Sequence, residues 1–239
     1  MDCAKKNLSE FWKGVSDVDL EIGKQSYPSY QKTLRQFAEF YGTPFIPTVE
    51  AFVALSPNND YHGNLRSLAS VLWVAAGNIV PFSEVTISTY RACGERALGY
   101  LSGEVSFLDT VGGLKIRAFR DNILYLEKSR RVTVDGHMVA ICSGTEKMTM
   151  KEAAFALNDH LYRKNEKAIL SFARSKKIAP CDVQATMWVS RKRRLGIKMD
   201  TTADMFTGKS RWDGVLDPME FPPFQHKEWR NWIKETGRA

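Results

Sequence analysis

Two glycines precede a lysine in the segment LDTVGGLKIRAF, residues 108–119. Because glycine adopts positive φ angles at little cost, Gly112 and Gly113 fit a tight hairpin between two helices. Backbone N–H groups at such a turn and at the following helix N-terminus can bind a phosphate. Lys115, one residue into the predicted helix, would then lie beside that phosphate. A simple helix–helix turn with a surface lysine explains the same residues without a ligand.

A single aspartate stands among apolar and β-branched residues in RVTVDGHMVAI, residues 131–141. Asp135 is either the N-cap of the helix that follows or a partly buried catalytic carboxylate, and one side chain can serve both roles. His137 is either its partner in an Asp–His pair or a packed histidine. The β-branched residues favour a strand, whereas the position between helices favours an extended entry into a helix.

Several short polar side chains precede a predicted helix in AFVALSPNNDYHGNL, residues 51–65. A plain helix cap explains them. The alternative is that three of them line the same pocket as Asp135. These three are Asn59, Asp60 and Asn64.

The densest positive cluster lies in WVSRKRRLGIK, residues 188–198. Its consecutive basic residues are Arg191, Lys192, Arg193 and Arg194. Such a cluster can follow a DNA backbone through phosphate contacts, or it can be a solvated helix end. Gln184 and Trp188 share a helical face with Arg191, where they can hydrogen-bond to a base or stack on it; a core tryptophan is the alternative. The net charge of +7 fits a polyanionic partner, nucleic acid first, or a basic protein without one.

Length and composition limit the class of protein. The 239 residues, 44% hydrophobic and 26% charged, are typical of a globular chain that needs no metal or disulfide to bury a core. The four cysteines are dispersed without a CxxC pair, which favours a reducing compartment and argues against a zinc ribbon or a four-cysteine iron–sulfur cluster. The chain has no segment long enough to cross a membrane, so we expect a cytoplasmic protein.

Helical periodicity without repeated alternating strands predicts an all-α fold. The expected helices cover 27–41, 48–57, 58–77, 84–101, 104–110, 114–126, 151–178 as one helix or two, and a last helix from about Pro180. Residues 1–26 are expected to form a helix around Trp12 and then a loop. We expect one domain over 1–196, with the hairpin at 105–126 and the aspartate segment at 132–142. An irregular tail with a short helix follows over 197–239.

A glycine hairpin with a lysine after it, followed by V-D-x-H-V, resembles the helix-hairpin-helix DNA glycosylase superfamily. The family patterns L-P-G-V-G-x-K and V-D-T-H-V correspond here to DTVGGLK and VDGHMV. The resemblance covers residues 105–142. The hairpin order differs, Gly136 replaces threonine, and the iron–sulfur cysteines of some members are missing. The resemblance implies a pocket between two helical halves, Lys115 at the position of the Schiff-base nucleophile, and Asp135 at that of the catalytic carboxylate.

A narrower resemblance adds the segment AFVALSPNNDYHGNL to these two elements. The three together are similar to phage and plasmid glycosylase-like proteins tied to thymine hypermodification, of the alpha-glutamyl/putrescinyl thymine pyrophosphorylase type. This resemblance implies a transferase acting on a base flipped out of double-stranded DNA. It would join a small amine or amino acid to 5-pyrophosphoryloxymethyl-uracil and release pyrophosphate.

The implied roles differ between the hypotheses. In the transferase, Asp135 is the base for the amine, and Lys115 or the nearby Arg117 and Arg120 bind pyrophosphate. In a DNA glycosylase/AP lyase, Asp135 stabilises the sugar cation and Lys115 attacks C1′. The third hypothesis is a DNA-binding module without catalysis. His137 completes the substrate-binding set, and no cofactor is expected beyond a monovalent cation or Mg²⁺ held by hairpin carbonyls.

Overall fold

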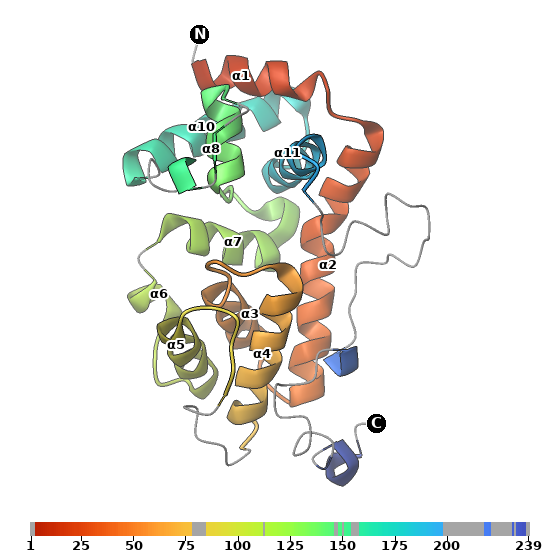
Figure 1. Cartoon of the computed structure of the whole chain (residues 1–239), viewed down its shortest axis with the longest axis vertical. Helices are drawn as coiled ribbons and strands as arrows, with labels where there is room; N and C mark the ends of the chain where they lie inside the picture. Colours follow the sequence, from red (N-terminus) through yellow and green to blue (C-terminus); the bar gives the residue numbers. More distant parts are fainter. Residues whose placement is uncertain are drawn as a thin grey trace. The chain divides into compact units, whose positions relative to one another are not determined.

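The computed structural model describes residues 3–77, 85–111, 113–145, 148–149, 151–153, 158–197, 218–220, 231 and 233–237. Every regular element in these residues is helical, which confirms the predicted all-α class (Figure 1). Among the described helices, none is both long and apolar enough to span a membrane.

Two compact units divide the chain. Unit 1 comprises Met1–Ser29 and Gly113–Lys209, and unit 2 comprises Tyr30–Gly112 and Ser210–Ala239. The borders fall inside the long helix α2 (Asp17–Tyr41) and at the glycine pair. Unit 1 therefore contains both catalytic candidates, Lys115 and Asp135.

The core of unit 1 lies among α1 (Cys3–Trp12), α8 (Gly136–Ser143), α10 (Asp159–Lys176) and α11 (Pro180–Arg194). α8 is apolar and buried along nearly its whole length, whereas α10 is amphipathic and buries one stripe that includes Ile169 and Phe172. Asn158 begins α10 by accepting a hydrogen bond from the Leu161 N–H at 2.9 Å. Pro180 begins α11, where its missing N–H leaves no bond unmade. α7 (Leu114–Tyr125) and the short 3₁₀ helix η2 (Leu126–Lys128) connect this core to the segment that precedes Asp135.

The core of unit 2 lies among α3 (Phe45–Ala54), α4 (Tyr61–Ala75) and α5 (Arg91–Ser102), with the short α6 (Phe107–Thr110) after them. α3 is buried from Thr48 to Ala54 except at Glu50, as expected for a helix with few polar residues. The Tyr61 ring packs edge-on against Tyr30, with centroids 4.9 Å apart, and against Phe52 at 6.2 Å. In the tail, the structure describes the 3₁₀ helix η3 (Pro218–Glu220) and helical residues at 231 and 233–236.

The expected loop before residue 27 is wrong, because α2 already begins at Asp17. A reciprocal cap fixes this start: the Ser16 N–H donates to Asp19 at 3.0 Å, and the Asp19 N–H donates to the Ser16 hydroxyl at 3.1 Å. The helix also continues through Pro28. The sequence pattern S-x-x-D at 16–19 was the signal for this helix start.

Other helix boundaries also differ from the expected ones: the helix expected at 48–57 is α3, Phe45–Ala54, and the helix expected at 104–110 begins only at Phe107. The helix expected at 84–101 begins only at Arg91, and the described residues before it are held outside a helix by their neighbours. The Ser88 N–H donates to the Ser67 hydroxyl at 2.9 Å, and the Thr89 hydroxyl donates to the Pro57 carbonyl at 2.6 Å. The segment 151–178 contains two helices, since Asn158 caps a new one.

Candidate active site

Asp135 caps a helix at the end of an extended segment. Residues 129–135 have no helical structure, and α8 begins directly after them at Gly136. The Asp135 Oδ1 atom accepts a hydrogen bond from the Met138 N–H at 3.0 Å. The predicted cap and the predicted extended entry are both confirmed. The carboxylate is half-buried, so part of it stays accessible.

His137 lies in the interior, two residues beyond this cap. Its Nδ1 atom is 2.7 Å from Nη1 of Arg191, and its ring meets Trp188 edge-on at 6.1 Å. A guanidinium group only donates hydrogen bonds, so Nδ1 must be the acceptor. His137 is therefore neutral, with its proton on Nε2.

Charges from three elements act on the His137 imidazole. Burial is the largest cause that lowers the pKa of His137, and the positive charges of Arg191, Lys192 and Lys115 lower it further. The negative charge of Asp135 opposes them and raises the pKa. Lys115 on α7 and Asp135 at the start of α8 therefore lie within electrostatic reach of one imidazole, as a common site requires.

This lowered pKa predicts a stability that depends on pH. Below about pH 6.5 the unfolded chain protonates His137, whereas the folded chain resists protonation, so folding is destabilised as the pH falls. The free energy of unfolding should therefore decrease more steeply below pH 6.5 in the wild type than in His137→Gln, by at most about 1.4 kcal/mol per pH unit. Glutamine keeps a neutral acceptor for Arg191, and urea titrations at a series of pH values measure the difference. If the free energy of unfolding of the two proteins depended on pH in the same way, the lowered pKa of His137 would be contradicted.

Lys115 lies in the first turn of α7 and is half-buried. Gly113 is the N-cap of this helix, with φ of −77° and ψ of 121°. The positive φ that we expected of the glycine pair is therefore wrong for Gly113, and Gly112 lies outside the described residues. No described atom lies within 4 Å of the position that a Cβ on Gly113 would occupy. Neither backbone strain nor a close neighbour in the chain therefore requires a glycine at residue 113.

Gly113→Ala tests whether glycine at this position serves the fold or the approach of a DNA phosphate to the backbone. We expect an unfolding free energy within about 0.5 kcal/mol of the wild type, because φ and the surroundings both accept a methyl group. DNA affinity should fall severalfold if a phosphate approaches this backbone. Denaturant titration and fluorescence anisotropy with labelled duplex DNA measure both quantities. Unchanged affinity would mean that no phosphate approaches the backbone at residue 113.

The two arginines of α7 differ in their surroundings. Arg120 is mostly buried and pairs with Asp121, whose carboxylate lies 3.1 Å away. Asp121 also approaches Arg131 at 3.3 Å. Arg117 is half-buried on the same helix. Binding of pyrophosphate by Arg120 would therefore have to compete with an existing ion pair.

The basic cluster at the end of α11 is engaged within unit 1. Arg191 is only 4% exposed and also donates to the Met148 carbonyl at 3.1 Å. The Lys192 ammonium lies 4.0 Å from the centroid of the Trp188 ring. Arg193 donates to both oxygens of the buried Asp19, at 2.9 and 2.5 Å. Arg194 donates to the Phe11 carbonyl at 2.9 Å and stacks on its ring.

The structure does not support DNA contact by Arg191 or Gln184. Gln184 is 5% exposed and accepts a hydrogen bond from the Tyr27 hydroxyl at 2.7 Å. Both side chains were expected to face a DNA strand, but helical spacing does not reveal which face of α11 the rest of the unit covers. Trp188, Lys192, Arg193 and Arg194 keep some exposure, and their DNA contacts stay predictions.

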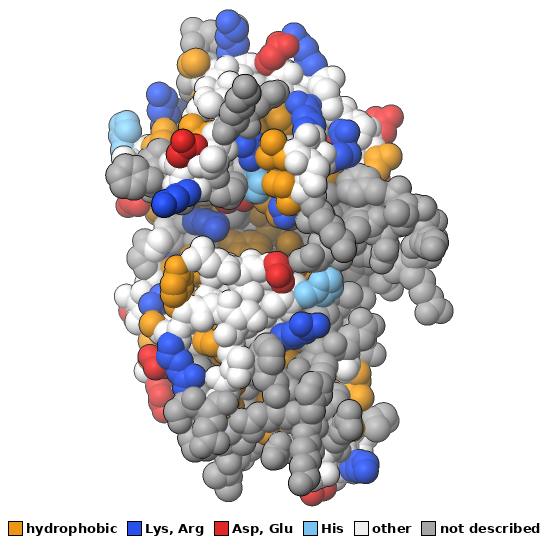
Figure 2. Space-filling view, in the orientation of Figure 1, with side chains coloured by type: hydrophobic (Ala, Val, Ile, Leu, Met, Phe, Trp, Pro, Cys, Tyr) orange, Lys and Arg blue, Asp and Glu red, His pale blue; other side chains and the backbone are white. Residues whose placement is uncertain are grey.

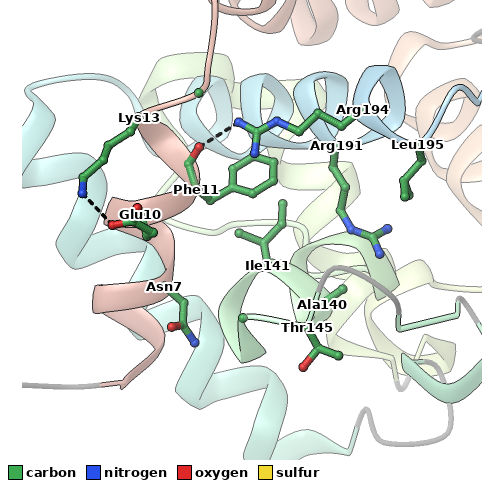
Figure 3. Close-up of a pocket in the computed structure, with 12 residues that line it drawn as sticks. Asn7, Glu10, Phe11, Lys13, Ala140, Ile141, Thr145, Arg191, Arg194 and Leu195 are labelled. Atoms are coloured by element: carbon green, nitrogen blue, oxygen red, sulfur yellow. Dashed lines mark hydrogen bonds and ion pairs between the residues drawn. The ribbon is translucent and has the colours of Figure 1, made fainter.

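A cavity of about 610 Å³ lies in unit 1 between α1 and the C-terminal ends of α8 and α11. Figure 3 shows two arginines extending from α11: Arg194 reaches Phe11 on α1, and Arg191 points toward the side of Ile141 and Thr145. This volume is in the range of small-molecule sites. Because Arg191 both lines the cavity and donates to His137, it links the cavity to the Asp135 segment.

The three polar candidates of unit 2 have local roles. Asp60 caps α4 and accepts from the Gly63 N–H at 2.6 Å, which confirms the predicted cap. Asn59 donates to the Leu55 carbonyl at 3.3 Å, and the buried Asn64 donates to the Phe52 carbonyl at 3.1 Å. The Oδ1 atom of Asn64 has no hydrogen-bond donor among the described residues. Whether these residues share a pocket with Asp135 stays a prediction.

Sequence reasoning missed the residues that hold the extended segment before Asp135. The Tyr162 hydroxyl donates to the Val132 carbonyl at 2.7 Å and accepts from the Val134 N–H at 3.2 Å. Glu166 accepts from the Val132 N–H at 3.2 Å. These contacts satisfy buried backbone groups that would otherwise require a strand partner. The spacing of Tyr162 and Glu166 on one helix face was the only signal in the sequence.

Buried polar side chains hold the other side of this segment. The Asn122 amide contacts the hydroxyl groups of Tyr27, Ser129 and Thr133 at 2.7 to 3.3 Å. Turning the amide lets it donate to Ser129 and accept from Thr133 and Tyr27. The network joins α2, α7 and the extended segment, so the position of Asp135 depends on contacts with α2, which lies about 100 residues earlier in the sequence, as well as with the neighbouring α7.

The chain belongs to a family of unknown function, DUF7178, whose model matches residues 2–195. No curated protein and no solved structure matches the chain. Family membership therefore groups the chain with relatives over both units up to the end of α11, and leaves the activity to be inferred from the site.

Proposed function

We propose that this protein is a DNA base-modifying transferase that acts on a flipped-out modified pyrimidine. It joins a small amine or amino acid to 5-pyrophosphoryloxymethyl-uracil in DNA and releases pyrophosphate. The observation that carries the proposal is the placement of two residues from segments that resemble the glycosylase hairpin and aspartate elements: Asp135 caps α8 with a half-buried carboxylate, and Lys115 lies half-buried in the first turn of α7. The proposal implies a fold of the helix-hairpin-helix glycosylase kind, and the helical character of all described regular elements supports it at the level of the all-α class.

The proposed reaction uses Asp135 as the base. The amine nitrogen attacks the methylene carbon on C5 of the uracil, a C–N bond forms, and the C–O bond to pyrophosphate breaks. The amine proton passes to the Asp135 carboxylate. The Met138 N–H fixes Oδ1 of that carboxylate, and no described residue donates to Oδ2, which supports its use as the proton acceptor.

Positive charge at α7 supports the departure of pyrophosphate. Lys115 and Arg117 lie in the first turns of this helix and stay partly exposed. A cation beside the leaving group stabilises the charge that develops on its oxygens. The cavity beside Arg191 has the size of a small-molecule site, which supports a co-substrate of low molecular weight.

A DNA glycosylase is the second candidate, and the ion pair of Arg120 favours it. Because Arg120 already pairs with Asp121, fewer cations are available for pyrophosphate than the transferase reaction would use. In the glycosylase reaction the C1′–N bond breaks, the base leaves, and water or the Lys115 amine adds to C1′. Asp135 would stabilise the positive charge on the sugar.

The masses of nucleosides separate the two reactions. DNA containing 5-pyrophosphoryloxymethyl-uracil is incubated with the protein and a mixture of amines and amino acids, and is then digested to nucleosides. A heavier nucleoside that requires both the pyrophosphorylated base and an amine is the expected result. Free base or abasic sites would assign the protein as a glycosylase instead. If neither a heavier nucleoside nor a free base or abasic site is formed, the result favours the third hypothesis, a DNA-binding module.

Borohydride trapping addresses Lys115 independently. A glycosylase that uses Lys115 as a nucleophile forms a Schiff base, which borohydride reduces to a stable protein–DNA adduct. The transferase proposal predicts no adduct, and it predicts that Lys115→Gln weakens the reaction by weakening contact with the leaving group. An adduct that disappears in Lys115→Gln would favour the glycosylase.

A further inference from the structure

Helix α10 carries a row of basic side chains on its exposed side. We call this set the α10 basic face; it consists of Arg163, Lys164, Lys167 and Arg174 on the helix, with Lys177 at its C-cap. All five side chains are exposed. The four helical residues fall within an arc of about 100° at 3.6 residues per turn, opposite the stripe that packs into the core. The four helical cations therefore lie on one side of α10, with three of them within about one turn and Arg174 about two turns further on.

The cations of this face are not engaged within the described part of the chain. None of them makes a hydrogen bond, an ion pair or a ring contact with a described residue. The basic residues at the end of α11 differ, because each of them contacts a side chain, a ring or a carbonyl of unit 1. Lys176, next to this face, lies over the rings of Trp12 and Phe172 at 5.9 and 5.5 Å.

The acidic residues of α10 do not neutralise the face. Asp159 stands four residues before Arg163 but forms no ion pair with it, and Glu166 turns toward the extended segment, where it accepts from the Val132 N–H. Arg163 and Lys167 stand four residues apart, a spacing at which like charges repel each other on a helix. A ligand that brings several negative charges would relieve this repulsion.

We propose that the α10 basic face binds the sugar–phosphate backbone of double-stranded DNA. From Arg163 to Arg174 the helix rises about 16 Å, which equals the rise of about five nucleotides along the axis of the DNA duplex. Lysine and arginine bind phosphates without reading the base sequence. The proposal rests on the proposed function only for the choice of DNA among polyanions.

The composition of the face favours DNA over a lipid surface. Helices that lie on membranes present large apolar side chains beside their basic ones. The large hydrophobic residues that are exposed in the described part of the chain do not include any from α10. Figure 2 shows blue Lys and Arg side chains on the visible surface of unit 1. The α10 basic face is a second set of cations in this unit, distinct from the basic cluster at the end of α11.

The test compares two variants with equal charge. The first carries Arg163, Lys164, Lys167 and Arg174 all changed to Gln, and the control carries Lys32, Arg66, Lys128 and Arg130 changed to Gln. All eight positions are exposed, and glutamine is a good helix former, so both variants should fold. Circular dichroism and denaturant titration verify this.

Anisotropy of a labelled duplex of about 20 base pairs is measured over a salt series, because each phosphate contact adds about 0.9 to the slope of log K against log salt. We expect the slope of the first variant to fall by about 3 and its affinity by about 10-fold or more at 0.1 M salt. The control should bind like the wild type. Equal slopes for the first variant and the control would overturn the proposal, as would a loss seen only with single-stranded RNA or with an acidic peptide.

Asp135→Asn distinguishes this proposal from the proposed function. It should bind duplex DNA with the wild-type slope whether or not the reaction assignment is correct. If the wild type modifies no DNA, the proposed function fails, and if Asp135→Asn remains fully active, only the role of Asp135 as the base fails; the α10 basic face stands in both cases. If the wild type modifies DNA, Asp135→Asn is inactive and the α10 variant binds DNA normally, the proposed function stands and the proposal for the α10 basic face fails.

Discussion

Asp135→Asn should abolish the modification of DNA while leaving the protein folded. Asparagine is as good an N-cap as aspartate, and its side-chain oxygen can still accept from the Met138 N–H. It cannot take up the proton of the attacking amine, so product formation should fall by about 100-fold or more. The free energy of unfolding should change by less than about 0.5 kcal/mol. Product is measured as modified nucleoside, and stability by urea titration.

Asp135→Ala provides the comparison. Alanine removes both the acceptor for the Met138 N–H and the carboxylate, so it should lose the activity and also about 1 kcal/mol of stability. If Asp135→Ala is destabilised but both variants stay active, Asp135 is only a cap. That result would contradict the role of Asp135 in both proposed reactions.

Gly23→Ala should cause the largest loss of stability. A Cβ on Gly23 would lie 2.1 Å from the Thr186 hydroxyl oxygen, 2.5 Å from the Thr186 backbone nitrogen and 2.6 Å from its Cα. Helices α2 and α11 thus touch through their backbones here, and rotation of a side chain cannot relieve the overlap. We expect a loss of about 3 kcal/mol, because the two helices must separate.

Gly99→Ala is the matched control for Gly23→Ala. A Cβ at residue 99 would also come close to a neighbour, at 2.9 Å, but that neighbour is the Cγ2 methyl group of Val105, which can rotate. Its cost should be smaller, and denaturant midpoints at constant m-value compare the two. Equal losses would show that the contact between α2 and α11 is less rigid than the structure indicates.

Local signals of capping were readable from the sequence. Asp60 and Asp135 were both expected to begin helices, and both do, because a cap depends on residues only three positions apart. The start of α2 at the Ser16–Asp19 pair carried the same kind of signal. The S-x-x-D pattern at 16–19 therefore predicts the helix start better than the polar composition of residues 1–26 does.

Long-range burial could not be read in the same way. Consecutive basic residues on α11 point all around the helix, so some of them must meet other helices. Arg191 and Arg193 accordingly reach His137 and Asp19. The basic residues of α10 are spaced on one face, and this spacing, more than local density, marks a free surface. The clamp of Tyr162 on the extended segment likewise depends on contacts about 30 residues away, as in its bonds to Val132 and Val134.

The masses of nucleosides from treated DNA test the central claim most directly. Pyrophosphorylated DNA is incubated with an amine and either wild-type protein or Asp135→Asn, after anisotropy has shown that both bind the DNA equally. The account predicts a new, heavier nucleoside with the wild type, one pyrophosphate released for each, and neither with Asp135→Asn. Equal product from the two proteins, or no product from the wild type with any amine, would contradict it.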